Sequence, residues 1–345
     1  ANGRLTSISD PAGRGSLTLG YSNGLLTSVT DWATPARVVN YGYDASGRLE
    51  TVTDREGKAT TFAYDGSSQR ISSITDARSH VALTLTYDGQ GRVATQKDAL
   101  GLSSGASTAF DYVVNGDGTR VTTVTSPPTS LEPSFSPTIE DHYSAQGWLT
   151  QRVSRPSSSE TLTEGYTYDL IGNRTSVTDA RGNRTDYCYD VNYSGGAIGG
   201  SRGNVTRIIG ASPSSGGPRP VTLMSYDAKS NLAQTVAPMG VASGANVTCT
   251  TNLSAFSSAY AKDLAYDATG TRLLSLTTRF TDPDSGLQTA VTKFEYGDAA
   301  NPGLVTRTIP PRGNASGSPD YSYATTSTYF ASGSKAGLLA QVSDP

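Results

Sequence analysis

The dipeptide Tyr-Asp recurs along this chain, and the residues that follow it are alike each time. Residues 43–49 read YDASGRL, residues 87–93 read YDGQGRV, and residues 266–272 read YDATGTR. Self-similarity at a period of roughly 20–50 residues is the signature of a repeat protein, whose units bury their surfaces against one another. The repeat constrains the fold more than length does, because it allows all 345 residues to form one continuous array.

Each repeat unit is expected to contain two β-strands. The first half has a Gly, two aliphatic residues three positions apart and an Asp, as in residues 47–54 (GRLETVTD). The second half ends on an apolar residue, a spacer and Tyr, as in Phe62 and Tyr64. Residues two apart on a strand share a face, so these two rings should point to the same side of a sheet.

The first half predicts an irregular strand. Leu49 and Val52 are three residues apart and cannot share one face of a regular strand. We therefore predict a β-bulge or a sharp bend between them. The segments 54–59 (DREGKA) and 179–184 (DARGNR) contain the Gly, Asp and Asn typical of hairpin turns.

About twelve tyrosines mark the successive units. They are Tyr21, Tyr43, Tyr64, Tyr87, Tyr112, Tyr143, Tyr168, Tyr189, Tyr226, Tyr266, Tyr296 and Tyr323. Seven of them are followed by an aspartate: Asp44, Asp65, Asp88, Asp169, Asp190, Asp227 and Asp267. We expect the tyrosines to stack as a ladder on neighbouring strands and the aspartates to accept backbone N–H bonds in the turn that follows.

Three stretches near 126–140, 191–220 and 238–260 lengthen the later units, and we interpret them as loops on a constant scaffold. Because the repeat resumes after each loop, we predict a single domain over residues 1–345. The chain starts inside one unit and stops inside another, which indicates a fragment of a longer protein.

Composition favours strands and gives no electrostatic reason to expect nucleic acid or an anionic membrane. Gly (37 residues) and Tyr (19) are abundant, and the net charge is −3. No apolar run approaches the roughly 20 residues that span a bilayer. Arg4, Arg48 and Arg92 recur beside the unit Gly and are expected to form a row with Asp54 and Asp98. Cys188 and Cys249 lack zinc-site spacing, and their pairing stays open.

The repeat resembles the Rhs-repeat, or YD-repeat, family. The resemblance rests on Gly-Arg-Leu, then Val/Ile-x-Asp, then a strand that closes on Tyr-Asp. Residues 47–65 (GRLETVTDREGKATTFAYD) fit throughout, and residues 172–190 fit with Arg174 in place of an aliphatic residue. The weakest units surround Tyr143, where Asp141 replaces the apolar partner, and Trp148.

The resemblance implies an all-β fold, with about twelve hairpins in a long curved antiparallel sheet that spirals into a shell or barrel. In bacterial members such a shell encloses a toxic domain, and in animal teneurins a related shell belongs to an adhesion receptor. The resemblance therefore implies a secreted or cell-surface location and, as partners, other parts of the same chain and an enclosed toxin domain. Residues 280–289 (FTDPDSGLQT) only partly match the self-cleavage segment of such toxins, and we predict a turn there.

Catalytic and metal-binding motifs have simpler structural interpretations. Ser201 lies in a Gly-x-Ser-x-Gly match but lacks the strand before it and the helix after it that a nucleophile elbow needs. His80 should begin a strand, and His142 has Glu140 and Asp141 beside it on a strand, where adjacent side chains face opposite sides.

Residues 115–119 (NGDGT) and 282–286 (DPDSG) resemble the start of a calcium loop but fit hairpin turns better. We predict no metal, no cofactor and no catalytic residue.

The sequence thus predicts a structural, non-catalytic segment that encloses or presents a toxin or effector domain. One alternative is an extracellular adhesion or stalk module that binds carbohydrate or protein through Trp32, Trp148 and the loops at 126–140 and 191–220. A glycan-cleaving enzyme ranks last, because the spacing nominates no pair of acidic residues.

Overall fold

The structure is a computed structural model that describes residues 3–10, 13, 15–190, 192–194, 197–199, 203–241, 244, 246–251, 256–315 and 318–345. Contacts group the chain into two compact units, Ala1–Thr163 and Glu164–Pro345. Both units are built from antiparallel strands, which confirms the all-β prediction. The single domain over residues 1–345 stays a prediction.

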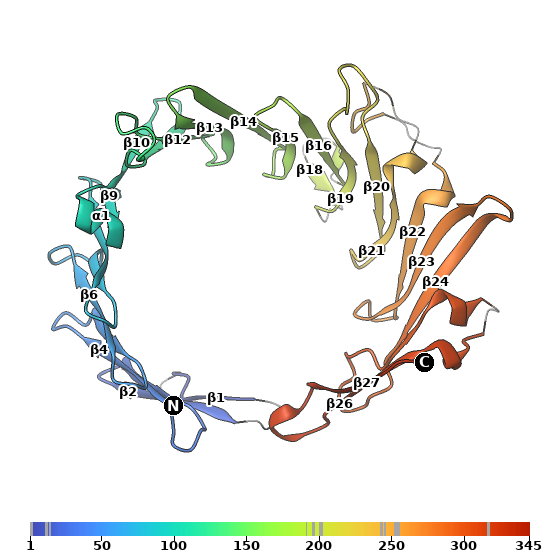
Figure 1. Cartoon of the computed structure of the whole chain (residues 1–345), viewed down its shortest axis with the longest axis horizontal. Helices are drawn as coiled ribbons and strands as arrows, with labels where there is room; N and C mark the ends of the chain where they lie inside the picture. The colour runs from blue at the N-terminus through green and yellow to red at the C-terminus, as the bar shows by residue number, and fades with distance from the viewer. Residues whose placement is uncertain are drawn as a thin grey trace. The chain divides into compact units, whose positions relative to one another are not determined.

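The first unit is a curved sheet in which each strand pairs with the next one along the chain (Figure 1, blue to green). Its strands are β1 (Ser7–Ser9), β2 (Ser16–Ser22), β3 (Leu25–Thr30), β4 (Val38–Tyr43), β5 (Leu49–Thr53), β6 (Ala59–Tyr64), β7 (Ile71–Thr75), β8 (Val81–Tyr87), β9 (Val93–Asp98), β10 (Thr108–Val114), β11 (Arg120–Thr125), β12 (Thr138–Tyr143) and β13 (Leu149–Ser157). The short helix α1 (Ala99–Ser104) follows β9, and Asp98 caps its N-terminus.

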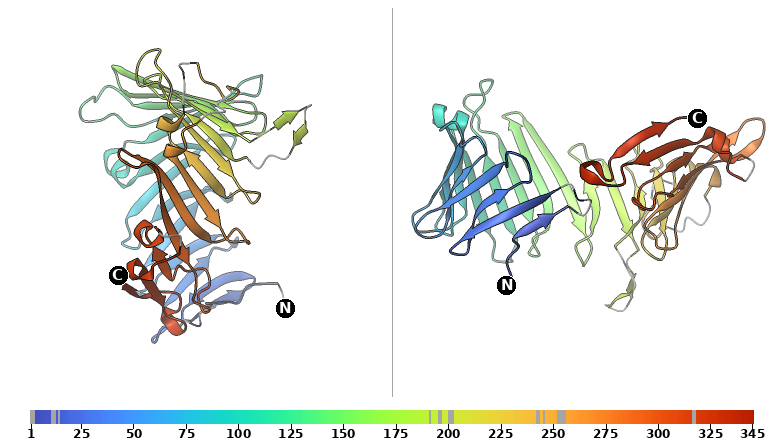
Figure 2. Two further views of the ribbon diagram at one scale, coloured as in Figure 1. Left: turned by 90° about the vertical axis from the view of Figure 1, so that its right-hand side faces the viewer. Right: turned by 90° about the horizontal axis from the view of Figure 1, so that it is seen from below.

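The second unit continues the same pattern with longer insertions. Its strands are β14 (Glu160–Tyr168), which begins before the unit boundary, β15 (Arg174–Thr178), β16 (Arg184–Tyr189), β17 (Asn192–Ser194), β18 (Ala197–Gly199), β19 (Val205–Ile209), β20 (Val221–Tyr226), β21 (Leu232–Val236), β22 (Ala261–Tyr266), β23 (Leu273–Asp282), β24 (Gly286–Glu295), β25 (Arg307–Ile309), β26 (Thr325–Tyr329) and β27 (Leu339–Ser343). Strands β17 and β18 form a separate ribbon, so β16 pairs with β19 (Figure 2).

Short 3-10 helices occupy the insertions of the second unit. They are η1 (Pro238–Gly240), η2 (Ser258–Tyr260), η3 (Pro311–Asn314), η4 (Tyr321–Tyr323) and η5 (Gly333–Lys335).

The predicted bulge is present in the β4–β5 hairpin. Tyr41 pairs with Val52 and Tyr43 pairs with Leu49, and the register shifts between Gly42 and Tyr43. One extra residue on β5 therefore returns both aliphatic side chains to the tyrosine face, and all four of these side chains are half-buried. The same shift precedes the unit tyrosine in nine further strand pairs.

The opposite face of this hairpin carries small polar side chains. A Cβ added to Gly42 would stand 2.3 Å from the hydroxyl oxygen of Thr51, its cross-strand partner. Gly20 and Ser28 repeat this arrangement in β2 and β3, with a separation of 2.4 Å. A larger residue at either glycine would have to displace its neighbour, so this face of the hairpin has room for small side chains only.

Full burial is confined to a few places. In the described part of the first unit, Gly101 is the one buried residue, so that sheet is held by half-buried contacts and strand pairing. The second unit has a compact apolar cluster where the segment after β21 crosses the sheet: Cys188, Ile209, Val221, Val236, Val241, Val247 and Ala261.

Candidate functional site

The feature most closely tied to the repeat is a joint between successive units, seen clearly at residues 44–64. It begins with the turn after β4. The Asp44 Oδ1 atom accepts hydrogen bonds from the backbone N–H groups of Ser46 and Arg48, both at 2.9 Å. Its Oδ2 atom accepts from the Nε of Arg48 at 2.7 Å. The N–H of Arg48 is the leading cause that lowers the pKa of the Asp44 carboxyl below its ordinary value.

The arginine held by that turn reaches the next unit. The guanidinium of Arg48 lies over the ring of Tyr64, 4.4 Å from the ring centroid. Its Nη1 donates to the carbonyls of Gly66 and Ser68 at 2.9 and 2.5 Å. The hydroxyl of Tyr64 donates back to the carbonyl of Leu49 at 2.6 Å. The turn after the Tyr-Asp of one unit thus positions Arg48 and the Leu49 carbonyl, and both contact the tyrosine of the next unit.

The joint recurs in both units of the chain. The tyrosine-to-carbonyl bond also joins Tyr21 to Leu5, Tyr43 to Leu26, Tyr87 to Ile71, Tyr189 to Arg174, Tyr226 to Val205, Tyr296 to Leu273 and Tyr329 to Val305. A guanidinium lies over a tyrosine ring in the pairs Arg4–Tyr21, Arg70–Tyr87, Arg92–Tyr112, Arg174–Tyr187 and Arg272–Tyr296.

Asparagine replaces this arginine in several later turns. Asn231 Nδ2 donates both to Asp227 Oδ2 and to the carbonyl of Gly270 in the next unit, each at 3.0 Å. Asn204 likewise binds Asp190 Oδ2 at 3.0 Å and Ser230 Oγ at 3.2 Å. The shorter side chain keeps the turn-to-turn link.

Apart from Tyr112, which lies inside β10, and Tyr323, which lies in η4, the structure places the predicted repeat residues at or next to a strand end or in the following turn. Tyr168 and Tyr266 end β14 and β22 and pair with Arg174 and Leu273 across a bulge. Among the aspartates, Asp65 binds Arg70, whereas Asp88, Asp169 and Asp267 accept turn N–H groups. The structural role that we assign to these residues remains a proposal.

One expectation about partners was wrong. Arg48 and Arg92 do not pair with Asp54 and Asp98 but with Asp44 and Asp88, four residues earlier in the same turn. The stacking of the tyrosines as a ladder stays a prediction; the contact that the structure shows on several of their rings is a guanidinium. The Gly-Arg dipeptide ends a tight turn, so its side chain folds back over that turn and across the next strand.

The last unit is marked by a different tyrosine from the one predicted. Tyr329 pairs with Leu339 across the usual bulge and donates to Val305 at 2.8 Å. Tyr323 instead lies in η4, with Arg312 over its ring at 4.8 Å. The insertion between β25 and β26 carries this second tyrosine, and sequence spacing alone did not separate the two.

The irregular unit at Tyr143 contains an ion pair at the position of an apolar pair. Asp141 is the cross-strand partner of Arg152, and the two bind through both carboxylate oxygens at 2.7 and 2.8 Å. Tyr41 and Val52 occupy the same places in the β4–β5 hairpin. The departure from the repeat pattern is therefore matched on both strands.

The remaining candidates have structural surroundings. His80 precedes β8, and His142 lies 3.6 Å from Glu140 on the same face of β12. Residues 115–119 form a hairpin turn, closed by the bonds between Asn115 and Thr119. Residues 282–286 form another, in which Asp282 Oδ1 accepts from Ser285 N at 2.8 Å. Ser201 lies outside the described residues.

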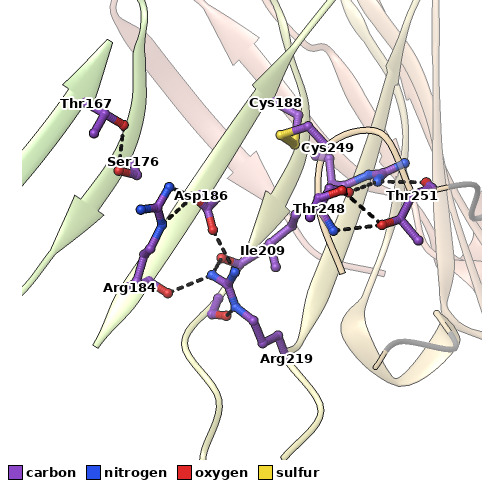
Figure 3. Close-up of polar contacts among 12 residues, drawn as sticks. Thr167, Ser176, Arg184, Asp186, Cys188, Ile209, Arg219, Thr248, Cys249 and Thr251 are labelled. Carbon is purple, nitrogen blue, oxygen red and sulfur yellow. Dashed lines mark hydrogen bonds and ion pairs between the residues drawn. A yellow bond between two sulfur atoms is a disulfide. The ribbon is translucent and has the colours of Figure 1, made fainter. Parts of the chain in front are cut away.

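A second feature, which the sequence had left open, is a loop tied to the sheet by the Cys188–Cys249 disulfide (Figure 3). Nearby, Arg219 anchors the base of the 210–220 loop. Its guanidinium binds Asp186 at 2.7 Å and the carbonyls of Arg184, Gly210 and Ile209 at 2.8 to 2.9 Å. The one signal in the sequence for this anchor was an arginine within a Pro/Ser/Gly-rich loop.

Within the described ranges, no group of three or more His, Cys, Asp or Glu side chains is arranged to hold a metal ion. In the same part of the chain, no helix has the length and apolar character needed to cross a bilayer.

Comparison with known proteins connects the joint to a family. The RHS Repeat family model matches residues 43–81, which contain the Asp44–Arg48–Tyr64 joint. The chain is similar to the crystal structure of TcdB2-TccC3, at 13% identity and a TM-score of 0.44, over 91% of this chain and 16% of that one. It is also similar to the Photorhabdus luminescens Tc holotoxin pore with the mutation TccC3-D651A, at 14% identity and a TM-score of 0.46, over 91% and 16% of the two chains.

Proposed function

Since this chain belongs to the Rhs/YD-repeat family, we propose that it is a structural, non-catalytic segment of a β-shell that encloses or presents a toxin or effector domain. The joint between units is the observation that carries the proposal. Each unit supplies its neighbour with a carbonyl acceptor and a guanidinium, so the sheet can extend by one hairpin at a time.

The thickness and the strand pairing of the sheet support this proposal. In the first unit the sheet is one layer thick, and the β4–β5 hairpin has half-buried tyrosines and aliphatic residues on one face and small polar residues on the other. Paired strands leave no free edge between neighbouring hairpins, so the layer excludes other chains from its backbone groups. The wall would be secreted or displayed at the cell surface together with its parent chain.

Electron microscopy and solution scattering of the isolated chain test this proposal. We expect a curved wall about one sheet thick. A compact solid particle or a straight rod would overturn the shell interpretation. Co-expression with the following segment of the parent chain, and its protection from protease, would then test enclosure directly.

The alternative function is an adhesion or stalk module, and one observation favours it. Trp32 is 55% exposed, with its ring against the backbone of Gly15. A flat exposed indole can stack on a sugar ring. A glycan array that compares the unaltered chain with the variant Trp32→Ala tests this alternative. Equal binding by both would show that Trp32 takes no part in glycan binding.

A further inference from the structure

The disulfide-tied loop and the sheet beneath it line a cavity, open to solvent on one side, that the structural function does not use. The cavity has a volume of about 590 Å³ and is lined by residues of β15, β16, β19, β20 and β21, together with Cys249, Thr250 and Phe256 from the loop. Small-molecule sites typically occupy about 300–1,000 Å³. Cys188 and Val236 are buried at its wall, so the loop and the sheet are in close contact there.

The cavity lining carries one carboxylate and one guanidinium. Asp169 accepts hydrogen bonds from the backbone N–H groups of Ile171 and Asn173 and from Asn173 Nδ2 in its own turn. Arg207 has no carboxylate partner among the described residues. Arg207 is half-buried, and its Nη1 donates to the carbonyls of Thr248 and Thr251 at 2.6 and 3.1 Å. Among the described residues it makes no other hydrogen bond and no ion pair, which leaves Nε and Nη2 able to donate. Burial is the cause that lowers the pKa of Arg207. A charge held in this way favours an anion beside it.

The rest of the lining offers hydroxyl groups and an aromatic face. Thr206 Oγ1 donates to the Cys188 carbonyl, and Thr175 and Thr250 share their hydroxyls with one neighbouring threonine each. A hydroxyl has one donor and two acceptor positions, so each keeps capacity for a ligand. Phe256, which lines the cavity, is 42% exposed and presents an apolar surface.

We propose that this cavity binds an acidic sugar of the hexuronate class, as a monosaccharide or at the end of a short chain. Arg207 binds the carboxylate, the threonine hydroxyls bind the ring hydroxyls, and Phe256 contacts the apolar face of the pyranose. A neutral sugar would leave the arginine charge uncompensated, and a simple anion would leave the hydroxyls and the aromatic face unused. The proposal is independent of the shell function.

The disulfide has a defined part in this site. Thr248 and Thr251, whose carbonyls hold Arg207, flank Cys249, which is bonded to Cys188 on β16 (Figure 3). Cys249 is exposed, so a reductant can reach the bond. Reduction would free the loop, and the arginine would lose both the carbonyls that orient it and one wall of the cavity.

Isothermal titration calorimetry on the oxidised chain tests the proposal with glucuronate and galacturonate, and with glucose and acetate as probes of the hydroxyls and the charge alone. We expect binding of at least one uronate, about tenfold or more tighter than glucose, which lacks the carboxylate for Arg207, and than acetate, which lacks the ring hydroxyls and the apolar face. Equal binding of glucose or acetate, or no uronate binding at millimolar concentration, would overturn it.

Variants locate the site. Arg207→Gln should weaken uronate binding about tenfold or more, Arg207→Lys should weaken it less, and Arg272→Gln, a guanidinium on a tyrosine elsewhere in the array, should leave it unchanged. Unweakened binding by Arg207→Gln refutes the assignment. If Arg207→Gln does not fold, two measurements on the unaltered chain still decide. Binding through the Arg207 charge must weaken as the salt concentration is raised. Binding that needs the disulfide-tied loop must weaken when the disulfide is reduced.

Discussion

The hydroxyl of Tyr64 donates a hydrogen bond of 2.6 Å to the carbonyl of Leu49, 15 residues earlier in the chain. The residue before Leu49 is the arginine whose guanidinium covers the same tyrosine ring. The two contacts connect one hairpin to the next through the residues that define the repeat. The Tyr64 side chain is thus held in place by contacts at both its ring and its hydroxyl.

Removing the hydroxyl should separate the two contributions. We expect Tyr64→Phe to lower the free energy of unfolding by about 1 kcal/mol, the net value of one hydrogen bond, while the ring still packs under Arg48. Tyr64→Ala should cost about 3 kcal/mol or more, because the ring is lost as well. Urea denaturation measures both. Tyr260→Phe is the control, since Tyr260 has no hydroxyl partner among the described residues; an equal loss in that variant would contradict the joint.

The guanidinium should contribute through its shape as well as its charge. Arg48→Lys keeps the charge but cannot bind Asp44, Gly66 and Ser68 while covering the ring, so we expect a loss of about 1–2 kcal/mol. Arg55→Lys, at a position that is exposed and makes only a 3.7 Å contact with Glu56, should be neutral. Thermal denaturation compares the two variants, and similar melting temperatures would show that the Arg48 contacts do not contribute to stability.

Stability should fall in acid because of the turn aspartates. Turn N–H groups lower the pKa of Asp44, Asp54 and Asp76 below the ordinary value of 3.8. A carboxyl whose folded pKa is depressed contributes stability above its unfolded pKa and loses it as the pH falls through the folded pKa. We expect a constant urea midpoint from pH 7 to pH 5 and a decline below pH 4. The stability difference between the unaltered chain and Asp44→Asn should shrink over the same range; a difference that does not change with pH would exclude this origin.

The disulfide should stabilise the second unit. It closes a segment of 61 residues, for which the chain-entropy relation gives about 4 kcal/mol. Cys188→Ser with Cys249→Ser should lower the unfolding free energy by roughly that amount. The loss is smaller if the unfolded chain retains structure. Hydrogen exchange should rise at β16 and β19 but not at β4 and β5. Uniform exchange across both regions would point to a global rather than a local effect.

The ion pair at Asp141 and Arg152 should be replaceable by the apolar pair of its neighbours. Asp141→Ala or Arg152→Ala alone should each cost more than 1 kcal/mol, because each leaves a half-buried charge without its cross-strand partner. The double variant Asp141→Tyr with Arg152→Val restores the Tyr41–Val52 arrangement and should be as stable as the unaltered chain. Additive losses in a double-mutant cycle would show that the two positions are not coupled.

The sequence alone determined the local structure of each unit. Alternation, the Gly and Asp of the turns and the three-residue spacing of Leu49 and Val52 predicted strands, hairpins and a bulge, because each of these depends on residues within one hairpin. Only the tertiary structure decided which side chains meet across units. Arg48 stacks on Tyr64, Tyr329 replaces Tyr323, and Arg207 meets Thr248 because hairpin placement brings distant segments together. Spacing within a unit cannot reveal contacts between units, nor the course of a loop that crosses the sheet between β21 and β22.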